Sequence, residues 1–400
     1  MVIGIIGGGA SGMLAAWAAA QNGKVQVLLF ERQARLGRKL QATGNGRCNL
    51  SNLHASEGGF HGEDMEFSKA SLSAFGPEQT LQWFRKQGLF TVSESSGRVY
   101  PYSDQANSVV DVLRFALNQP NISVRTGCEI AKLRRQDGGF LVDGIFCDKV
   151  IIACGGLAGT KLGGSMSGYQ LLRSMGHKMT KLRPTLVQLK CGWSGITGLK
   201  GVRANCTAEI YHNGTLFASS QGEVQFTEYG LSGPVIFEIS RDVCQASGDW
   251  MCRLDLLPQI SLEELQEELF RRRQTSQPAE ELLTGVIHNR LGRVLTKVAG
   301  VPGNRLIASV TDADLVSVAE LVKSFEIPLT EPMGMDSAQV TAGGIRTDEF
   351  DPVTLESKLV PGLYACGEVL DVDGDCGGYN LQWAWSSGYC AGSHAGKEAL

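Results

Sequence analysis

The chain has 400 residues, a hydrophobic fraction of 43% and a formal net charge of −4, from 37 basic and 41 acidic residues. This length allows two or three lobes with a sizeable core. The slightly acidic balance gives no support to a nucleic-acid or anionic-membrane partner, since both select basic surfaces, and we expect neither. Fifty residues are glycine, well above the usual share of about 7%, which predicts many turns and close backbone approaches.

Eleven cysteines occur at irregular spacings, without a C-x-x-C pair. The odd number and the chain length favour reduced thiols in a cytoplasmic protein over a disulfide framework. The apolar N-terminus lacks a basic segment and is interrupted by glycines, so it predicts strand–turn–helix rather than a signal peptide or membrane span. His54 and His61 lie in a polar loop with Glu63 and Asp64, but their spacing has no ligand geometry, and no metal site is expected.

The first motif lies between an expected strand at residues 2–6 and an expected helix at 15–21. Gly7, Gly9 and Gly12 there have G-x-G-x-x-G spacing. In a dinucleotide fold the first glycine allows a tight turn and the second lets a pyrophosphate approach the backbone. The third lets helix and strand pack closely, and the helix N-terminus faces the phosphates.

An acidic residue completes this motif. A second β-branched run, at residues 25–30, ends on Glu31, which is 19 residues after Gly12. A carboxylate at this distance accepts hydrogen bonds from the ribose hydroxyls and disfavours a 2′-phosphate. The pattern therefore predicts FAD or NAD at this site.

A basic loop then distinguishes the two dinucleotides. The segment "RLGRKLQATGNGRCNLSN", residues 35–52, places Arg38, Lys39 and Arg47 around Gly44-Asn45-Gly46. Such a loop can lie against a phosphate and a flat ring, which favours FAD, whereas an NAD domain would continue its strand–helix alternation. The alternative is a solvated basic loop.

The remaining chain divides into a dinucleotide fold and an insertion. Expected helices are 79–86, 105–117 and 168–176, and expected strands are 122–125, 129–135, 140–143 and 150–154. From residue 191 short alternating strands begin, followed by charged helical sequence from 261 onwards. We assign residues 1–190 and 336–400 to a discontinuous FAD-binding domain. Residues 191–335 are the insertion, with a β-barrel-like part at 191–256 and a helical part at 257–335.

Several segments together carry a resemblance to a known family. They are the glycine motif, "TGNGRCN", "FTEYGLSGP", "VTAGGI" and "GLYACGEVLDVDGDCGGYNLQWAWSSG". Over its whole length the chain resembles bacterial FAD flavoproteins of the BaiN-like or aminoacetone-oxidase group. The resemblance implies an α/β fold: a glutathione-reductase-type, Rossmann-like FAD-binding domain with an inserted β-barrel and helical domain. One departure is Cys154, where the flavin fold often has Thr.

The resemblance also explains the Gly-Gly start of an expected helix near the C-terminus. In such folds the last strand carries Gly-Glu, here Gly367-Glu368, near the pyrophosphate and ribitol. Gly377 and Gly378 are then expected to let the backbone approach the isoalloxazine. The following N–H groups would bond the flavin O2, and the helix dipole would stabilise negative charge on the reduced ring.

The full set of expected cofactor-binding residues follows from the motif, the loop and the resemblance. It comprises Gly7, Gly9, Ala10, Ser11, Gly12, Glu31, Arg32, Arg38, Lys39, Thr43, Gly44, Gly46, Arg47, Cys48, Ile130, Ala153, Cys154, Gly155, Gly367, Glu368, Gly378, Asn380, Leu381 and Gln382.

No catalytic acid or base is assigned from the sequence. Candidates are Tyr379 as a proton donor over the ring, Cys48 as a redox thiol and Glu228 as a substrate-facing group. A structural role is the alternative for each: a wall for Tyr379, packing for Cys48 and a barrel surface for Glu228.

We expect an FAD-dependent oxidoreductase that acts on a small organic substrate. No second G-x-G-x-x-G lies in a strand–helix context, so NAD(P)H is expected to bind only transiently as a donor. One interpretation is an NAD(P)H-driven reductase of a conjugated C=C, like that of a bile-acid enone. The alternatives are an oxygen-using amine oxidase of the aminoacetone type, and a flavin-binding accessory or RNA-modification protein. The sequence sets no oligomeric state.

Overall fold

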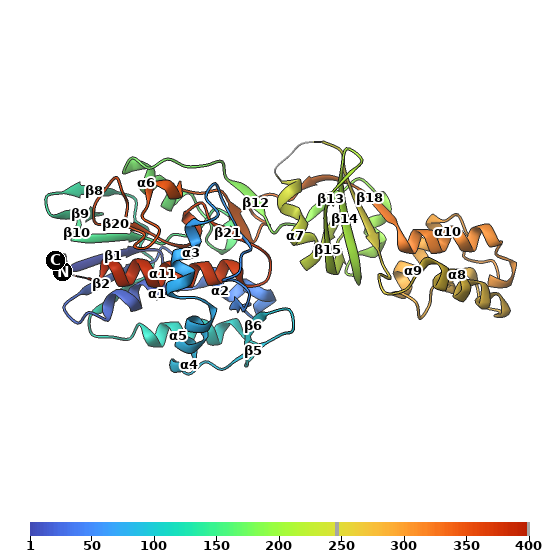
Figure 1. Ribbon diagram of the computed structural model, residues 1–400, viewed down its shortest axis with the longest axis horizontal. Coiled ribbons are helices and arrows are strands. Elements are labelled where there is room, and N and C mark those ends of the chain that lie inside the picture. The colour runs from blue at the N-terminus through green and yellow to red at the C-terminus, as the bar shows by residue number, and fades with distance from the viewer. Residues whose placement is uncertain (245–247, 398–400) are drawn as a thin grey trace. The chain divides into compact units, whose positions relative to one another are not determined.

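The computed structural model describes residues 1–244 and 248–397 and divides into two compact units (Figure 1). The first is formed by Met1–Arg183 with Gln339–Leu400, and the second by Pro184–Ala338. The sequence placed the insertion at residues 191–335. The first unit therefore comes from both ends of the chain, and the second lies between them in sequence.

A parallel five-stranded sheet forms the centre of the first unit. Its strand order is β20-β11-β1-β2-β7, and each neighbouring pair is parallel. The strands are β1 (Val2–Ile6), β2 (Gln26–Phe30), β7 (Ile122–Arg125), β11 (Lys149–Ile152) and β20 (Leu363–Ala365). The first four lie within two residues of the expected places, and β1, β2 and β11 are mainly apolar. The carboxyl ends of parallel strands meet at one sheet edge, where ligands bind in open α/β sheets.

Helices and short strands surround this sheet. The helices are α1 (Ala10–Ala20), α2 (Arg38–Ala42), α3 (Phe67–Ala74), α4 (Pro77–Lys86), α5 (Ala106–Ala116), α6 (Ser167–Ser174) and α11 (Tyr379–Ala395). The short strands are β3 (Ser51–Asn52), β4 (Phe60–His61), β5 (Thr91–Ser93), β6 (Arg98–Pro101), β8 (Leu133–Gln136), β9 (Gly139–Val142), β10 (Ile145–Cys147), β12 (Arg183–Thr185), β19 (Val340–Ala342) and β21 (Asp373–Gly374). Strands β8 and β9 pair antiparallel, and the strand expected at 129–135 begins only at Leu133.

Helix α11 packs directly on the backbone of α1, and the two lie alongside each other in Figure 1. A methyl group on Gly388 would lie 2.4 Å from the Ser11 carbonyl oxygen, and one on Gly392 would lie 2.2 Å from that of Ala15. Glycines at this four-residue spacing lie on one face of α11. Because the paired residue numbers increase together in both helices, α1 and α11 run parallel.

The second unit contains a closed antiparallel barrel with strand order β13-β16-β15-β14-β17-β18. Its strands are β13 (Leu189–Cys191), β14 (Arg203–His212), β15 (Thr215–Phe226), β16 (Gly230–Ser232), β17 (Trp250–Asp255) and β18 (Phe325–Pro332). The helices of this unit are α7 (Pro234–Val243), α8 (Leu262–Arg271), α9 (Asn289–Val298) and α10 (Asp312–Lys323). The expectation of a purely helical part at 257–335 is wrong, because β18 pairs with both β17 and β13 and closes the barrel.

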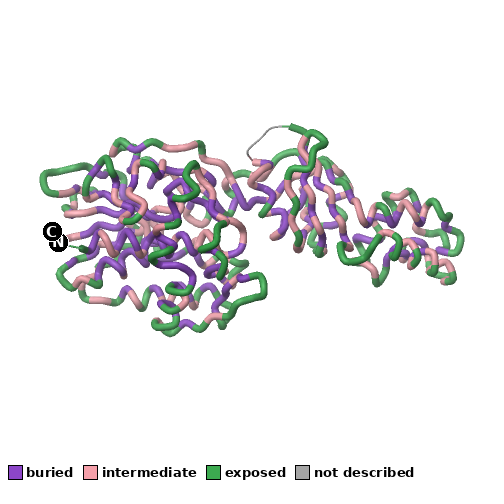
Figure 2. Tube along the Cα trace, viewed as in Figure 1, coloured by how far each residue is buried: buried purple, intermediate pink, exposed green. Residues whose placement is uncertain are grey.

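Each unit has its own hydrophobic core, and buried residues concentrate along the sheet and α1 in one and along the barrel in the other (Figure 2). The eleven cysteines are all free thiols. Among the described residues, no helix has the length and apolar character needed to cross a membrane.

The Gln382 side chain joins three elements of the first unit. It is fully buried; its Oε1 accepts a hydrogen bond from Ser51 at 2.7 Å, and its Nε2 donates to Thr80 and Ser386 at 2.9 Å each. Its backbone N–H donates to the Gly378 carbonyl. All donors of Gln382 therefore have protein partners, and the expectation that it binds the cofactor is wrong.

We predict that Gln382→Met lowers the free energy of unfolding of the first unit by about 2–4 kcal/mol, because three buried hydroxyl groups lose their partner. Thermal unfolding followed by tryptophan fluorescence measures the effect. Gln170→Met, at an exposed position of α6, is the matched control and should shift the midpoint little. Equal midpoints for the two variants would show that the network adds no stability.

A buried histidine makes the stability of this unit depend on pH. His177 contacts Glu349 through Nδ1 at 2.8 Å and Ser357 through Nε2 at 3.0 Å, and it stacks on Phe350. Burial lowers the pKa of His177 below its ordinary value of 6.5, although the hydrogen bond to Glu349 opposes this shift. The folded state therefore holds His177 neutral where an unfolded chain takes up a proton.

The free energy of unfolding should consequently fall as the pH falls below 6.5, by at most about 1.4 kcal/mol per pH unit from this group. His177→Gln should lose this contribution to the slope. Urea unfolding of both proteins at about pH 7.5, 6.5 and 5.5, above most carboxyl pKa values, measures it. The same pH dependence in both proteins would contradict the prediction.

Candidate dinucleotide site

The three glycines of the N-terminal motif differ in what surrounds them. Gly7 has φ +112°, and a methyl group there would lie 2.3 Å from the Ala153 carbonyl oxygen. A methyl group on Gly12 would lie 1.8 Å from the carbonyl oxygen of Gly7, whereas one on Gly9 would meet nothing within 4 Å. The tight turn at Gly7 and the close packing at Gly12 are thus confirmed. Gly9 leaves open space beside bare backbone, which fits a pyrophosphate.

Helix α1 begins at this open space. Gly9 provides no capping side chain, and the first turn contains no acidic residue. The first N–H groups of a helix have no intrahelical acceptor and carry a partial positive charge. Ala10 and Ser11, expected to bind the cofactor, lie in this first turn, so the start of α1 fits an anionic group such as a phosphate.

Glu31 is held in place at the end of β2. One carboxylate oxygen accepts from the Gly8 N–H at 2.8 Å and the other from the Gln33 N–H at 2.7 Å. A carboxylate has about four lone-pair positions, so two hydrogen bonds leave it able to accept more. Its contact with the ribose hydroxyls stays a prediction.

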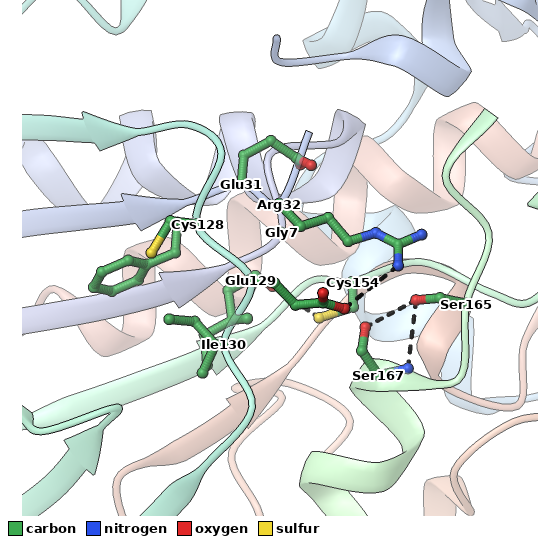
Figure 3. Close-up of a pocket in the computed structure, with 11 residues that line it drawn as sticks. Gly7, Glu31, Arg32, Cys128, Glu129, Ile130, Cys154, Ser165 and Ser167 are labelled. Atoms are coloured by element: carbon green, nitrogen blue, oxygen red, sulfur yellow. Dashed lines mark hydrogen bonds and ion pairs between the residues drawn. The ribbon is translucent and has the colours of Figure 1, made fainter. Parts of the chain in front are cut away.

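A pocket opens directly beside Glu31 (Figure 3). Its lining residues are Ile6, Gly7, Phe30, Glu31, Arg32, Cys128, Glu129, Ile130, Cys154, Ser165 and Ser167. Five of these residues belong to the set expected from the sequence, and the pocket lies where the motif places the adenosine half of a dinucleotide. No sequence motif marks Cys128, Glu129 and Ser165, which lie in loops, or Ser167, which begins α6.

The basic loop and the C-terminal Gly-Glu pair meet in the structure. Lys39 Nζ lies 2.8 Å from Glu368 Oε2, and Glu368 Oε1 accepts from the Thr341 N–H at 2.8 Å. Residues 329 positions apart in the chain thus lie side by side. Both were expected near the cofactor, and their pairing neutralises the carboxylate that would otherwise repel a phosphate.

Other residues of the basic loop have protein partners. Arg47 pairs with Asp104 and lies over the Tyr100 ring, while Arg38 donates to Gln33 at 2.8 Å. A methyl group on Gly46 would meet nothing within 4 Å, whereas one on Gly44 would lie 2.8 Å from the Asn49 N–H nitrogen. Gly46 therefore leaves open backbone, as expected, and Gly44 does not. Thr43 caps the α2 turn through a hydrogen bond to Leu40 O.

The remaining expected contacts line the same region. Ala153 and Ile130 are buried, Gly155 has φ +71° with open space around it, and Gly367 packs against Ser11. Cys154 donates to the Ile6 carbonyl at 3.3 Å and lines the pocket.

The Gly-Gly start of α11 has a different cause from the expected one. Gly377 and Gly378 have φ values of +114° and +105°. A methyl group on Gly378 would lie 2.3 Å from the Ser51 carbonyl oxygen, and one on Gly377 would lie 2.9 Å from Arg98 Nε. Glycine is therefore needed at both positions because protein atoms leave no room for a side chain, and the space is not one left open for a flat ring. Our explanation of the two glycines is wrong in this respect.

The N-terminus of α11 itself stays available. It has neither a capping side chain nor an acidic residue in its first turn, which contains Asn380 and Leu381. The Asn380 side chain accepts from the Gly374 N–H at 2.8 Å and donates to the Gly374 carbonyl at 2.7 Å. Asn380 thus holds the turn after β21 through its side chain, and its backbone N–H remains in the first helical turn.

The parallel packing places both helix starts toward the same end of the unit. Gly388 contacts Ser11. Ser11 is one residue after the start of α1, whereas Gly388 is nine residues after the start of α11. At about 1.5 Å per residue, α11 begins about 12 Å beyond the start of α1. Two positive helix ends at this offset fit an extended group that carries phosphates at one end and an electron-accepting ring at the other.

The three catalytic candidates from the sequence differ in burial and in their partners. Cys48 is fully buried, and burial raises its pKa to about 12, so a reactive thiolate is excluded at neutral pH. Glu228 is an exposed residue of the second unit and pairs with Lys200 at 2.5 Å, as a barrel-surface residue would. Tyr379 is half-buried, with its ring edge-on to Phe60 at 5.9 Å. Only Tyr379 stays a candidate.

The structure adds one acid–base pair that the sequence did not indicate. His61 Nε2 lies 2.7 Å from Asp375 Oδ1, and both side chains are partly exposed. They are 314 positions apart, so no local pattern could reveal the pair. Strands β4 and β21 bring them together, next to the start of α11. Among the described residues, no cluster of His, Cys, Asp or Glu is suited to hold a metal ion.

Known proteins match the whole chain. The family model of the HI0933-like protein Rossmann domain matches residues 1–394. The chain is 40% identical to a 3-dehydro-bile acid delta(4,6)-reductase of Clostridium scindens, over 99% of both chains. It is 32% identical to a ribosomal RNA dihydrouridine synthase of Escherichia coli, over 97% of this chain and 96% of the relative. A 3-ketosteroid delta1-dehydrogenase of Sterolibacterium denitrificans has the same fold, with a TM-score of 0.52 at 11% identity and coverage of 98% and 99%.

Fold, motif and relatives define an FAD-dependent oxidoreductase with a Rossmann-type cofactor domain. Within this class the chain belongs to the HI0933-like family.

We predict that Gly9→Ala leaves the fold intact but weakens FAD binding roughly 10- to 100-fold, because the methyl group enters the space expected for the pyrophosphate. Gly23→Ala, also in open space but in the turn before β2, is the matched control. Flavin content after dialysis and the thermal midpoint without flavin are measured. Full flavin retention by Gly9→Ala would place the phosphates elsewhere.

Proposed function

We propose that this protein is a reductase that saturates a C=C bond conjugated with a carbonyl group in a small organic substrate such as an oxo-bile acid or related enone, with NAD(P)H as the electron source. The observation that carries the proposal is the 40% identity to the Clostridium scindens reductase over the full length of both chains. Such coverage includes the cofactor domain and the inserted unit alike.

The residues of this chain would hold FAD in an extended form. Gly9 and the first turn of α1 would bind the pyrophosphate, and Glu31 with the adjoining pocket would bind the adenosine. The start of α11 would face the ring and stabilise negative charge there. When bound, FAD supplies two-electron hydride chemistry.

The net reaction balances without a metal ion or oxygen. Two electrons and a proton leave NAD(P)H as a hydride equivalent, giving NAD(P)⁺. The hydride equivalent is added to the β-carbon of the conjugated system, and a proton is added to the α-carbon or first to the carbonyl oxygen. His61 with Asp375, or Tyr379, would supply this proton, since these side chains lie near the start of α11.

A second candidate substrate is ribosomal RNA, favoured by the 32% identity to the Escherichia coli dihydrouridine synthase. Dihydrouridine is uridine whose C5=C6 bond, conjugated with a carbonyl, is saturated, so the two reactions share their chemistry. The lower identity and the net charge of −4 support the small substrate more than RNA. An amine oxidase is a third possibility, but neither full-length relative named above is an oxidase.

Anaerobic flavin reoxidation distinguishes these substrates. We expect NADPH or NADH to bleach the purified yellow protein, and a 3-oxo-Δ4,6 steroid to restore the colour while its mass increases by two hydrogens. The saturated 3-oxo steroid, which lacks the C=C bond, is the control and should leave the protein bleached. Reoxidation by unmodified ribosomal RNA alone would assign the RNA reaction. Bleaching of the oxidised protein by aminoacetone in place of NAD(P)H, followed by return of the colour when oxygen is admitted, would assign the oxidase reaction.

A further inference from the structure

We infer that Arg32 is a latch that holds residues 155–167, here called the strap, across the adenosine end of the pocket and thereby slows release of the bound dinucleotide. The inference rests on the proposed FAD site and concerns how that site opens. It depends on a side chain that contacts both walls of one pocket.

The first contacts join Arg32 to the strap. Arg32 Nη2 donates to the carbonyl oxygen of Gly163 at 2.7 Å and lies 3.5 Å from that of Gly164. Gly163 has φ +116°, so its backbone turns sharply where the guanidinium binds it. A charged donor on a carbonyl oxygen is a stronger anchor than a neutral one.

The second contact joins Arg32 to the opposite wall. Its Nη1 lies 3.6 Å from Glu129 Oε1, and Figure 3 shows the side chain extending across the pocket between Glu129 and Ser165. The Arg32 side chain is 27% exposed and that of Glu129 is 64% exposed, so solvent screens this ion pair and the hydrogen bond to Gly163 is the stronger of the two contacts. One planar guanidinium thus bridges two walls, which a single ammonium group does less well.

The strap is closed by its own backbone hydrogen bonds. Ser165 donates to the Gly156 carbonyl at 3.1 Å, which joins its two ends, and Ala158 donates to Thr341 Oγ1 at 2.9 Å, which anchors it to β19. Between them, residues 159–164 form a self-contained turn with hydrogen bonds from Leu162 and Gly164 to Gly159. The turn also packs against α2. The Arg32 guanidinium joins it by a charged hydrogen bond to the segment that follows β2.

Opening the strap would uncover the adenosine half of the site. Ser165 and Ser167 line the pocket and are 2.9 Å apart through their hydroxyl groups. They face Glu31 and Arg32 across it. Arg32 is therefore a positioning residue: it holds the wall that encloses the adenosine, and the ring end of the dinucleotide lies near α11, away from it.

The test compares dissociation of FAD from Arg32→Met and wild type. We expect roughly 10- to 100-fold faster release from Arg32→Met, measured as the rise of free-flavin fluorescence after dilution of the holoprotein into flavin-free buffer. ADP, which contains only the adenosine half and phosphates, should bind the apoprotein more weakly by a similar factor. FMN lacks the adenosine half, so its affinity should be the same in both proteins. Arg114→Met, an exposed arginine of α5 paired with Asp111, is the matched control.

Trypsin provides a readout of the strap itself. Lys161 is exposed within the turn, and cleavage after it should be faster in Arg32→Met and slowed by ADP in wild type. Glu129→Gln, which keeps Arg32, should give a smaller change in the same direction and serves where Arg32→Met does not fold. Unchanged FAD release and unchanged cleavage at Lys161 in a folded variant would overturn the latch. An equal loss of FMN and FAD affinity would also overturn it. A wild-type protein that binds neither FAD nor ADP would instead overturn the proposed function.

Discussion

The close contact between α1 and α11 is the constraint on which the first unit depends. Gly388, Gly392 and Gly396 press the backbone of α11 onto the small residues of α1, at distances that exclude any side chain. A helix pair packed this tightly has one register and one direction. That register sets where α11 begins relative to the glycine motif, and so it joins the two ends of the chain into one site.

Two polar residues of α11 also hold the start of this helix in place. Gln382 ties the helix to two neighbouring segments through buried hydrogen bonds, and Asn380 holds the turn before it. The residues nearest the expected ring end thus position the helix start, and the backbone N–H groups are left for a ligand.

The sequence predicted those features that depend on residues close together in the chain. The turn at Gly7 and the packing at Gly12 follow from their own spacing, because strand, turn and helix are consecutive in the chain. The apolar strands were predicted for the same reason. What the sequence could not reveal comes from contacts between distant segments. Gly378 was assigned to a ligand because Ser51, its actual neighbour, lies more than three hundred residues away. Strand β18 was missed because its alternating residues follow a helix, and only pairing with β13 shows that it closes the barrel. The His61–Asp375 pair has no sequence signal at all.

Charge in the candidate site follows a consistent pattern. Two carboxylates, Glu31 and Glu368, lie where an anionic dinucleotide is expected, and unshielded they would repel it. Glu368 is neutralised by Lys39, and Glu31 is stabilised by two backbone N–H groups. Neither carboxylate therefore needs a counter-ion from the ligand, and both keep lone pairs for hydroxyl groups. The positive ends of α1 and α11 remain without an acidic residue in the first turn, so phosphates and a ring placed there, as proposed, would each meet a favourable potential. The carboxylates would then bind hydroxyl groups and the helix ends anionic groups of the same molecule.

The cysteines show how burial separates reactive from structural groups. Cys48 lies in the loop expected near the flavin, yet it is fully buried, and burial raises its pKa to about 12. Loss of hydration also raises the pKa of Cys154, a partly buried residue that lines the pocket, to about 12. A thiol in this environment stays protonated at neutral pH and is a poor nucleophile. The proposed proton transfer would then come from a group that water reaches. His61 is such a group, since it is a partly exposed imidazole held by the Asp375 carboxylate. Burial of these thiols therefore argues against thiol exchange at this site, and the proposed hydride and proton transfer does not need them.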